Sequence, residues 1–239
     1  MKRSLSPFIT LGWLSVLLVG CDPVAVTPTP STTSVPELAE QYASLEAAPE
    51  ETAFELEPEF RLLALADFQS FPADTATWSM DGDVLVSTGK PKGYVYSTDS
   101  FANFTWRFEY RFPRPEKLID DDKFKGNTGF LVYITGEPKI WPLCLEVQGK
   151  HVDLAAIKEN GGAETPEVDS DPDKRLAARN RVGQWNVLEI VSREGELTVS
   201  LNGYEVTHSQ PAFLSAGSIG IQAEDHPFEV RRMRIRVDP

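Results

Sequence analysis

Apolar and polar residues alternate along most of the chain after residue 60, in short runs separated by turn residues. A period of two places successive side chains on opposite faces of a strand. The pattern predicts ten strands, at residues 84–87, 94–98, 104–112, 129–134, 143–148, 187–192, 197–201, 205–207, 218–222 and 230–237. Because no convincing helix interrupts them, the sequence predicts an all-β sandwich or barrel.

The run 104–112 shows the alternation most strictly. Five aromatic residues occupy every second position, and Thr105, Arg107, Glu109 and Arg111 lie between them. We expect the aromatic face to pack in the core and the other face to meet water. In the closing run 230–237 the same reasoning places most of the arginines on a solvated face, opposite Met233, where they could pair with acidic residues.

The run 143–148 carries polar residues on one face only. Cys144, Glu146 and Gln148 share this face, while the leucines and Val147 between them share the other and should point into the core. Trp141 stands just before the run and His151 just after it. An acid, an amide, an aromatic ring and a titratable base in one stretch suit a sugar ligand. An ordinary solvated strand face is the alternative interpretation, since exposed Glu and Gln are common.

The first twenty residues predict export. Lys2 and Arg3 precede an apolar run, 8–19, that is too short to span a bilayer stably. Its end, Leu18-Val19-Gly20-Cys21, resembles the bacterial lipobox, in which the cysteine becomes the lipidated first residue of the mature protein. Cys21 and Cys144 are the only cysteines, so acylation of Cys21 leaves no partner for an intramolecular disulfide. Cys144 would then be a lone thiol without a Cys/His signature around it.

Residues 21–60 are rich in Thr, Pro, Ala and Glu and show no strand alternation. Such a segment buries too little apolar surface to offset chain entropy, so we expect a disordered linker. Residues 22–60 carry a charge of −9, residues 1–21 carry +2, and the rest of the net charge of −13 leaves −6 on residues 61–239. This acidic balance argues against nucleic acid as a partner, because phosphate binding needs a basic stripe. Residues 61–239 are long enough for one core.

Two acidic clusters in the later part of the chain are interpreted as loops. The first is Asp120-Asp-Asp122, close to two lysines. The second is Glu167-Val-Asp169-Ser-Asp171, which Pro172 and polar residues follow. It faintly resembles the carboxylate pattern of sandwich-fold retaining glycosidases, but the loop interpretation is preferred.

Several segments, taken in order and spacing, resemble one known family. They are Trp78-Ser-Met-Asp-Gly-Asp-Val-Leu85, Thr88-Gly-Lys-Pro-Lys-Gly-Tyr-Val95, the run 104–112, Asn127-Thr-Gly129, Glu146-Val-Gln148, Gly183-Gln-Trp-Asn-Val-Leu-Glu-Ile190, Leu201-Asn-Gly203 and Gly217-Ser-Ile-Gly-Ile-Gln222. Across residues 65–238 the chain is similar to the 3-keto-disaccharide hydrolase domain family. The resemblance implies a concanavalin-like jelly-roll sandwich, with Asn127, Glu146 and Gln148 directed toward the ligand face.

The resemblance also implies an activity, the cleavage of 3-keto-glycosides. A ketone at C3 acidifies the C2 proton, so a positioned base could remove it before the C1 leaving group departs with acid assistance. Glu146 or His151 would be the base and the other the acid. Asn127, Gln148 and Lys158 would hold hydroxyl groups or the developing oxyanion, and Trp141 would stack on the ring.

Other interpretations stay open at this point. The same face could belong to a non-catalytic carbohydrate-binding or adhesion domain, or to a structural surface domain that binds nothing. A divalent metal is open as well, although His151, His208 and His226 lack close ligand spacing. In each case we expect a lipoprotein held to a bacterial membrane through Cys21, facing the periplasm or the exterior. A carbohydrate is the expected ligand in all but the structural interpretation.

Overall fold

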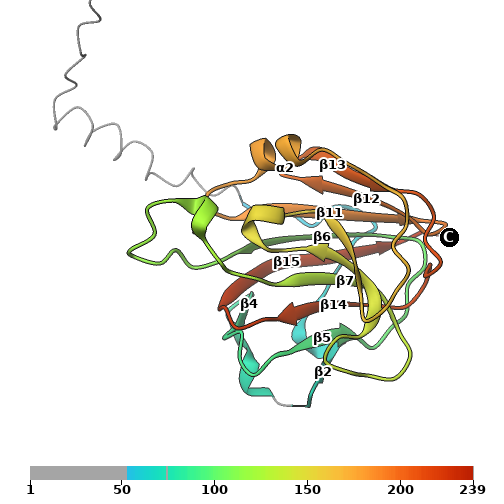
Figure 1. The fold of residues 1–239 in the computed structure, drawn as a ribbon. Coiled ribbons are helices and arrows are strands. Elements are labelled where there is room, and N and C mark those ends of the chain that lie inside the picture. Colours follow the sequence, from blue (N-terminus) through green and yellow to red (C-terminus); the bar gives the residue numbers. More distant parts are fainter. Residues whose placement is uncertain (1–52, 74, 239) are drawn as a thin grey trace, which may run out of the picture. The chain divides into compact units, whose positions relative to one another are not determined.

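The computed structural model describes residues 53–73 and 75–238, in which fifteen strands form two antiparallel sheets. The nine-stranded sheet has the order β10 (Val168–Ser170), β13 (Tyr204–Ser209), β12 (Glu196–Leu201), β11 (Asn186–Arg193), β6 (Phe104–Arg111), β15 (Phe228–Val237), β4 (Val84–Ser87) and β3 (Trp78–Asp81), and β1 (Arg61–Leu62) also pairs with β15. The six-stranded sheet has the order β2 (Phe68–Phe71), β5 (Gly93–Ser97), β14 (Ser218–Ala223), β7 (Gly129–Thr135), β8 (Leu143–Gln148) and β9 (Ile157–Asn160). The arrangement confirms the jelly-roll sandwich (Figure 1).

The hydrophobic core lies between the sheets and is rich in aromatic rings. Trp106 and Phe108 of β6 have ring centroids 4.6 Å apart, and Phe108 lies 4.4 Å from Phe130 of β7. On β8, Leu145 and Val147 are fully buried in the same cluster. The alternation in 104–112 and 143–148 therefore predicted the core faces of both strands correctly.

The outer face of β6 differs from the expectation that it meets water. Thr105 is only 2% exposed and Glu109 only 9%. A bulge in β15 explains part of this burial, because it shifts the register between Arg231 and Arg234. As a result Arg231 and Arg232 both reach Glu109, at 2.7 and 2.8 Å. The arginines do pair with acidic residues, but largely away from water.

Residues 53–60, here called the strap, cover the same outer face. Glu57 pairs with Arg234 at 2.5 Å and with Arg107 at 3.2 Å. The guanidinium of Arg234 lies 5.2 Å from the centre of the Phe54 ring, and that of Arg107 lies 4.9 Å from the centre of the Phe60 ring. The described end of the expected 21–60 linker is therefore bound to the nine-stranded sheet.

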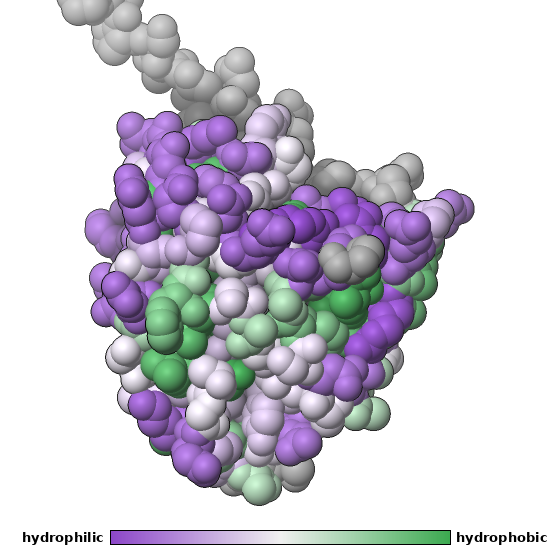
Figure 2. Space-filling view, turned by 90° about the vertical axis from the view of Figure 1, so that its right-hand side faces the viewer, coloured by the Kyte–Doolittle hydropathy of each residue, from purple (hydrophilic) through white to green (hydrophobic). Residues whose placement is uncertain are grey.

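A tryptophan on the same sheet face is held between two arginines. The guanidinium of Arg111 lies 4.3 Å from the ring centre of Trp185, and that of Arg231 lies 4.1 Å from it. Cation–π contacts of this kind fix the ring on the sheet. Figure 2 views the molecule from the right-hand side of Figure 1 and shows apolar patches separated by hydrophilic residues.

A short strand and a short helix correct the expectations that residues 167–171 form a loop and that the domain has no helix. Val168–Ser170 is strand β10, and helix α2 runs over Pro172–Ala178. The side chain of Asp171 accepts hydrogen bonds from the backbone N–H groups of Asp173 and Lys174, at 2.9 and 3.1 Å. Asp before Pro is an N-terminal helix signal, because it caps free N–H groups and proline fits the first turn. No helix in the described part of the chain is long and apolar enough to cross a membrane.

Candidate functional site

The outer face of the six-stranded sheet carries a second, smaller apolar cluster, formed by Tyr94, Leu131 and Cys144. Directly opposite residues of an antiparallel pair share a face. Glu146 is opposite Leu131 on one side and Lys158 on the other, and Gln148 is opposite Gly129. The polar face expected on 143–148 therefore continues across neighbouring strands and borders an apolar cluster.

Glu146 is buried on this face, with 8% of its surface exposed. Its Oε2 atom accepts a hydrogen bond from Asn160 at 3.3 Å, whereas Oε1 is buried and has no hydrogen-bond partner among the described residues. A side chain at Gly129 would place its Cβ 2.4 Å from Oε1, so the carboxyl group extends over this glycine. The absence of a side chain on β7 makes room for the carboxyl group.

Burial, followed by the nearby charge of Glu224, raises the pKa of Glu146 to about 7. Lys158 and the side-chain amides of Asn160 and Gln148 act in the opposite direction but do not compensate. A carboxyl group with this pKa changes its protonation state near neutral pH, as a general acid or base must. The solvated-face interpretation of Glu146 does not fit its burial.

Glu224 is the second carboxyl group of the site, and it follows β14 directly. Asn127 donates a hydrogen bond from Nδ2 to Oε2 of Glu224, while the Oδ1 atom of Asn127 is buried without a partner among the described residues. Burial raises the pKa of Glu224, and Lys92 opposes this effect. Lys92 is itself paired with Asp225 at 2.7 Å.

Gln222 of β14 is the fourth member of this cluster of polar side chains, after Glu146, Asn127 and Glu224. It is 1% exposed, and neither its amide nitrogen nor its amide oxygen has a partner among the described residues. Ile221 is paired with Phe130, so Gln222 lies alongside Gly129, below the carboxyl group of Glu146. Buried polar atoms are nearly always hydrogen-bonded in folded proteins. Three neighbouring side chains with free buried atoms therefore indicate a place for a polar ligand.

The remaining residues expected at the site are spread around it. Lys158 lies opposite Glu146 and pairs with Asp153 at 3.1 Å. The Oε1 atom of Gln148 accepts from the backbone of Lys150 at 2.8 Å. Trp141 precedes β8 and His151 follows it, so the two residues lie at opposite ends of this strand. Trp141 is 43% exposed.

Aromatic side chains on the site face come from β5 rather than from Trp141. The rings of Tyr94 and Tyr96 are 5.6 Å apart, and both line a hollow of about 120 Å³ together with Pro138 and Pro142. The phenol of Tyr96 donates to Gln69 at 3.2 Å. This hollow offers an apolar surface at the edge of the polar cluster around Glu146.

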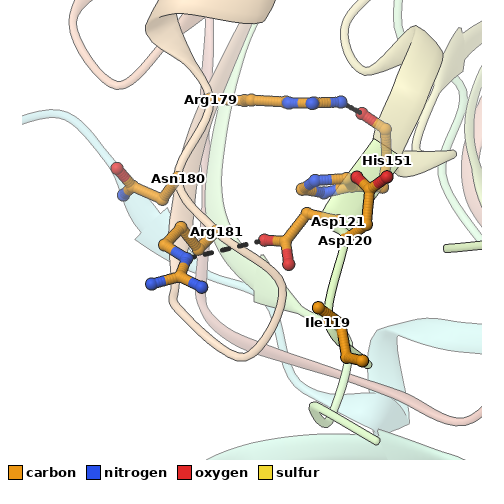
Figure 3. A pocket seen from close by; sticks show the side chains of 7 residues that line it. All are labelled: Ile119, Asp120, Asp121, His151, Arg179, Asn180 and Arg181. Atoms are coloured by element: carbon orange, nitrogen blue, oxygen red, sulfur yellow. Dashed lines mark hydrogen bonds and ion pairs between the residues drawn. The ribbon is translucent and has the colours of Figure 1, made fainter. Parts of the chain in front are cut away.

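His151 does not share its surroundings with Glu146. It lines a separate hollow with residues of the segments 119–121 and 179–181, and Figure 3 shows its imidazole directed into this space. Burial and the nearby charge of Arg179 lower the pKa of His151 to about 4.

Two further expectations concern cysteines and metals. Cys144 is buried, and burial raises the pKa of its thiol well above the ordinary range, which does not suit a nucleophile. Cys21 lies outside the described residues. Among residues 53–73 and 75–238, no group of three or more His, Cys, Asp or Glu side chains is placed to hold a metal ion.

Sequence reasoning did not assign Gln222 to the candidate site, and it preferred a loop to a ligand set for the cluster of Glu224, Asp225 and His226. Alternation offered a signal for Gln222, because Ile219 and Ile221 point into the core and Gln222 must then point outward. Glu224 follows the strand, in a Glu-Asp-His cluster that is more typical of a loop. Only the pairing of β14 with β7 brings it next to Asn127.

The fold is similar to that of solved structures. Two are candidate glycosyl hydrolases from Parabacteroides distasonis ATCC 8503. The first, with a TM-score of 0.54, is 16% identical and the match covers 73% of this chain and 89% of the other. The second, with a TM-score of 0.51, is 21% identical and the match covers 69% of this chain and 92% of the other. A carbohydrate-binding module from Bacillus subtilis has a TM-score of 0.49 at 12% identity, with 71% and 95% covered.

Comparison with curated proteins gave no significant match. The family model of the 3-keto-alpha-glucoside-1,2-lyase-like domain, in contrast, matches residues 64–236. This range begins just before the first 3₁₀ turn and ends within β15, so it includes both sheets except β1, and it includes the polar side chains around Glu146. The chain belongs to the family of 3-keto-alpha-glucoside-1,2-lyase-like domains.

Proposed function

We propose that the outer face of the six-stranded sheet binds a 3-keto-glycoside and cleaves it by elimination, with Glu146 as the general base. The observation that carries the proposal is the buried carboxyl group of Glu146, whose Oε1 atom has no partner and whose pKa is raised to about 7. A base must be ready to accept a proton near the working pH and must have a free oxygen aimed at the substrate. Membership of the family supports a glycoside as the substrate.

The reaction has two bond-breaking steps. In the first, Glu146 takes the proton from C2, and the C–H electrons delocalise onto the C3 carbonyl oxygen as an enolate. In the second, the enolate collapses to form a C1–C2 double bond, and the C1–O bond of the leaving group breaks. The departing oxygen takes a proton from a general acid. Hydrolysis needs a later addition of water to the unsaturated sugar.

Glu224 is the general acid that this site offers, in place of His151. Burial raises its pKa, and its charge is coupled to that of Glu146, so the two carboxyl groups titrate as a pair. In the active form of the pair, Glu224 holds the proton and Glu146 is ionised. Two neighbouring carboxyl groups in unequal surroundings commonly divide acid and base roles between them. His151, which lines a separate hollow that does not include Glu146, is assigned to binding instead.

Amides and a lysine surround the position of the enolate. Gln222 and Asn127 have free buried atoms, and Lys158 brings a positive charge opposite Glu146. Donors already fixed in a water-poor site stabilise a developing oxyanion without reorganising. Tyr94 and Tyr96 provide a surface against which the apolar face of a sugar ring can pack.

The test uses the full chain and a 3-keto-glycoside with a chromogenic leaving group. Replacement of a general base typically costs about 10² to 10⁴ in rate, so Glu146→Gln should reduce release by that factor. Glu159→Gln is the matched control, because Glu159 is an exposed carboxylate on the neighbouring strand β9. Activity of Glu146→Gln within about tenfold of the parent protein contradicts the role. Sugar binding without release in the parent protein supports a non-catalytic domain instead.

We further propose that the domain acts outside the cytoplasm of a bacterial cell, held to a membrane by a lipid on Cys21. The support comes from the basic start, the short apolar run and the small residue before this cysteine. A sugar-processing domain on the cell envelope would meet its substrates before they enter the cell.

A further inference from the structure

The hollow around His151 is the second site that the structure offers. It has a volume of about 340 Å³, and its main lining residues are Ile119, Asp121, His151, Arg179, Asn180 and Arg181 (Figure 3). Ligand pockets commonly range from about 300 to 1,000 Å³, so the hollow has room for a small ligand. Its walls come from three segments: the 119–121 segment, the turn after β8 and the segment after α2.

The walls are fixed without any ligand. Arg179 donates from Nη1 to the carbonyl oxygen of His151 at 2.7 Å and pairs with Asp122 through Nη2. Asp121 accepts from the backbone N–H of Val182 at 2.9 Å and pairs with Arg114 at 2.8 Å. These contacts join the 119–122 segment, the 179–182 segment and His151. The hollow is therefore a built feature of the fold, and it does not depend on one mobile side chain.

Some polar groups of the hollow remain available. His151 is only 3% exposed, and its Nε2 atom has no partner among the described residues. The side chain of Arg181 is 57% exposed, and its ion pair with Asp121 is long, at 3.9 Å. A buried ring nitrogen without a partner loses its water on folding and gains nothing in return. A ligand that bonds to this nitrogen removes that cost.

The charges of the hollow and its surroundings point to a neutral ligand. Three carboxylates, from Asp120, Asp121 and Asp122, lie close to three guanidinium groups, from Arg114, Arg179 and Arg181. The carboxylates disfavour a phosphate or sulfate, and the guanidinium groups disfavour a cation. A hydroxyl group both donates and accepts hydrogen bonds, so it can satisfy an imidazole nitrogen and a guanidinium together. Ile119, which is 93% exposed, adds an apolar edge suited to the C–H face of a sugar ring.

We propose that this hollow binds a second sugar unit of the glycoside whose keto-sugar occupies the Glu146 face. The identity of the ligand as a glycoside rests on the proposed function. His151 follows Glu146 by five residues, so their Cα atoms are at most about 18 Å apart. One oligosaccharide can reach both places, with Nε2 of His151 and the guanidinium of Arg181 binding its hydroxyl groups.

The test measures binding at His151 directly. The full chain, labelled with ¹⁵N at histidine, is titrated with trehalose, methyl α-glucoside and inorganic phosphate, and the His151 imidazole signal is assigned by its loss in His151→Gln. Trehalose should shift this signal, and Arg181→Ala should raise the dissociation constant by about tenfold, which corresponds to one lost good contact. Arg61→Ala is the control, because Arg61 is similarly exposed, at 44%, and pairs with Asp67 and Asp99 instead.

Three results overturn the inference: a His151 signal that no sugar moves, a signal that phosphate moves in place of sugar, or an affinity that Arg181→Ala leaves unchanged. The outcome is separable from that of the proposed function. Trehalose has no keto group, so its binding needs no chemistry at Glu146. Glu146→Gln should reduce turnover of a 3-keto-glycoside by about 10² to 10⁴, and trehalose should still shift the His151 signal of this variant.

Discussion

Glu146 has its carboxyl group where the charged form is disfavoured and where one oxygen has no partner. Proteins rarely tolerate such an arrangement without a function, because it costs stability. Two predictions at the scale of single residues follow from the raised pKa.

The first concerns the pH dependence of activity. The base form of Glu146 is the ionised one, so kcat/KM should rise with pH through about 7. The charge of Glu224 contributes to this raised pKa, and Glu224→Gln removes it. The rising limb of the pH–rate profile should therefore move to lower pH in Glu224→Gln, while the maximal rate falls. A rising limb that stays in place shows that the two carboxyl groups are not coupled.

The second concerns stability. The pKa of Glu146 is about 7 in the folded chain and near 4.5 in the unfolded one. The wild-type chain therefore loses stability as the pH rises from 4.5 to 7, since the folded state must release a proton it holds more tightly. Glu146→Gln avoids this loss, so it should be more stable than wild type at pH 8 by about 1–3 kcal/mol and nearly equal to it at pH 4. Urea unfolding at both pH values tests this, and a variant that is less stable at pH 8 contradicts it.

For single residues, the sequence predicts the strand face on which a side chain lies better than it predicts how deeply that side chain is buried. Alternation placed Glu146 and Gln148 on the outer face correctly, because side-chain direction in a strand is set locally. It did not predict that both residues are buried, since that depends on neighbours from β7, β9 and β14. His151 was grouped with Glu146 by closeness in sequence, and the turn after β8 leads it to another hollow.

The strap shows how an element without regular secondary structure can complete a sheet. Glu57 forms ion pairs with Arg234 and Arg107, and Phe60 is only 8% exposed. The hydrogen bond with Arg234 is the main cause that lowers the pKa of Glu57 to about 2. Residues 53–60 belong to the sandwich in energetic terms, although their composition resembles that of the preceding segment.

Replacement of Glu57 tests this at the element scale. Glu57→Gln should lower the free energy of unfolding at pH 7 by about 1–3 kcal/mol, because it weakens charged hydrogen bonds to Arg234, which is only 9% exposed. The folded pKa is depressed, so this contribution is present above pH 4.5 and disappears as the pH falls toward 2. Glu55→Gln in the same strap is the control, since Glu55 is exposed. Equal stability of the two variants at pH 7 means that the strap is not anchored by Glu57.

Elements with a strong local signal were predictable. Strands β4 and β8 have the expected bounds. Between β12 and β13, Asn202 and Gly203 adopt the positive φ values of 50° and 86° that a two-residue hairpin turn requires. Strands β9 and β10 were not predicted, because each contains only one apolar residue and so shows no alternation. In β15 the bulge after Arg231 reverses the alternation, so Val230 is buried on the same face as Met233.

The two outer faces of the sandwich have opposite characters. On the nine-stranded sheet, arginines and carboxylates neutralise each other and the strap covers them. On the six-stranded sheet, amides and carboxyl groups are buried with free atoms. The first face stabilises the fold, and the second is available to a ligand. Sequence alone identified the all-β class and the family resemblance, because both depend on patterns spread over the whole chain.

Membrane attachment is the prediction that belongs to the whole molecule. Cys21→Ala should move the protein from the membrane fraction to the soluble fraction, since a cysteine at this position is the expected acylation site. Fractionation followed by immunoblotting measures the change. Cys144→Ala serves as the control for loss of a cysteine and should remain with the membrane. Continued membrane retention of Cys21→Ala contradicts lipid anchoring.

The positions of the tryptophans make intrinsic fluorescence a measure of ligand binding. Trp78 and Trp106 are buried in the core, and Trp185 is held between Arg111 and Arg231 on the far sheet. Trp141, at the edge of the six-stranded sheet, is the tryptophan among the described residues that is most open to solvent and to added solutes. Iodide or acrylamide quenching should therefore report mainly on this one indole. A bound sugar that shields the indole of Trp141 should change the fluorescence emission, and Trp141→Phe should remove this change.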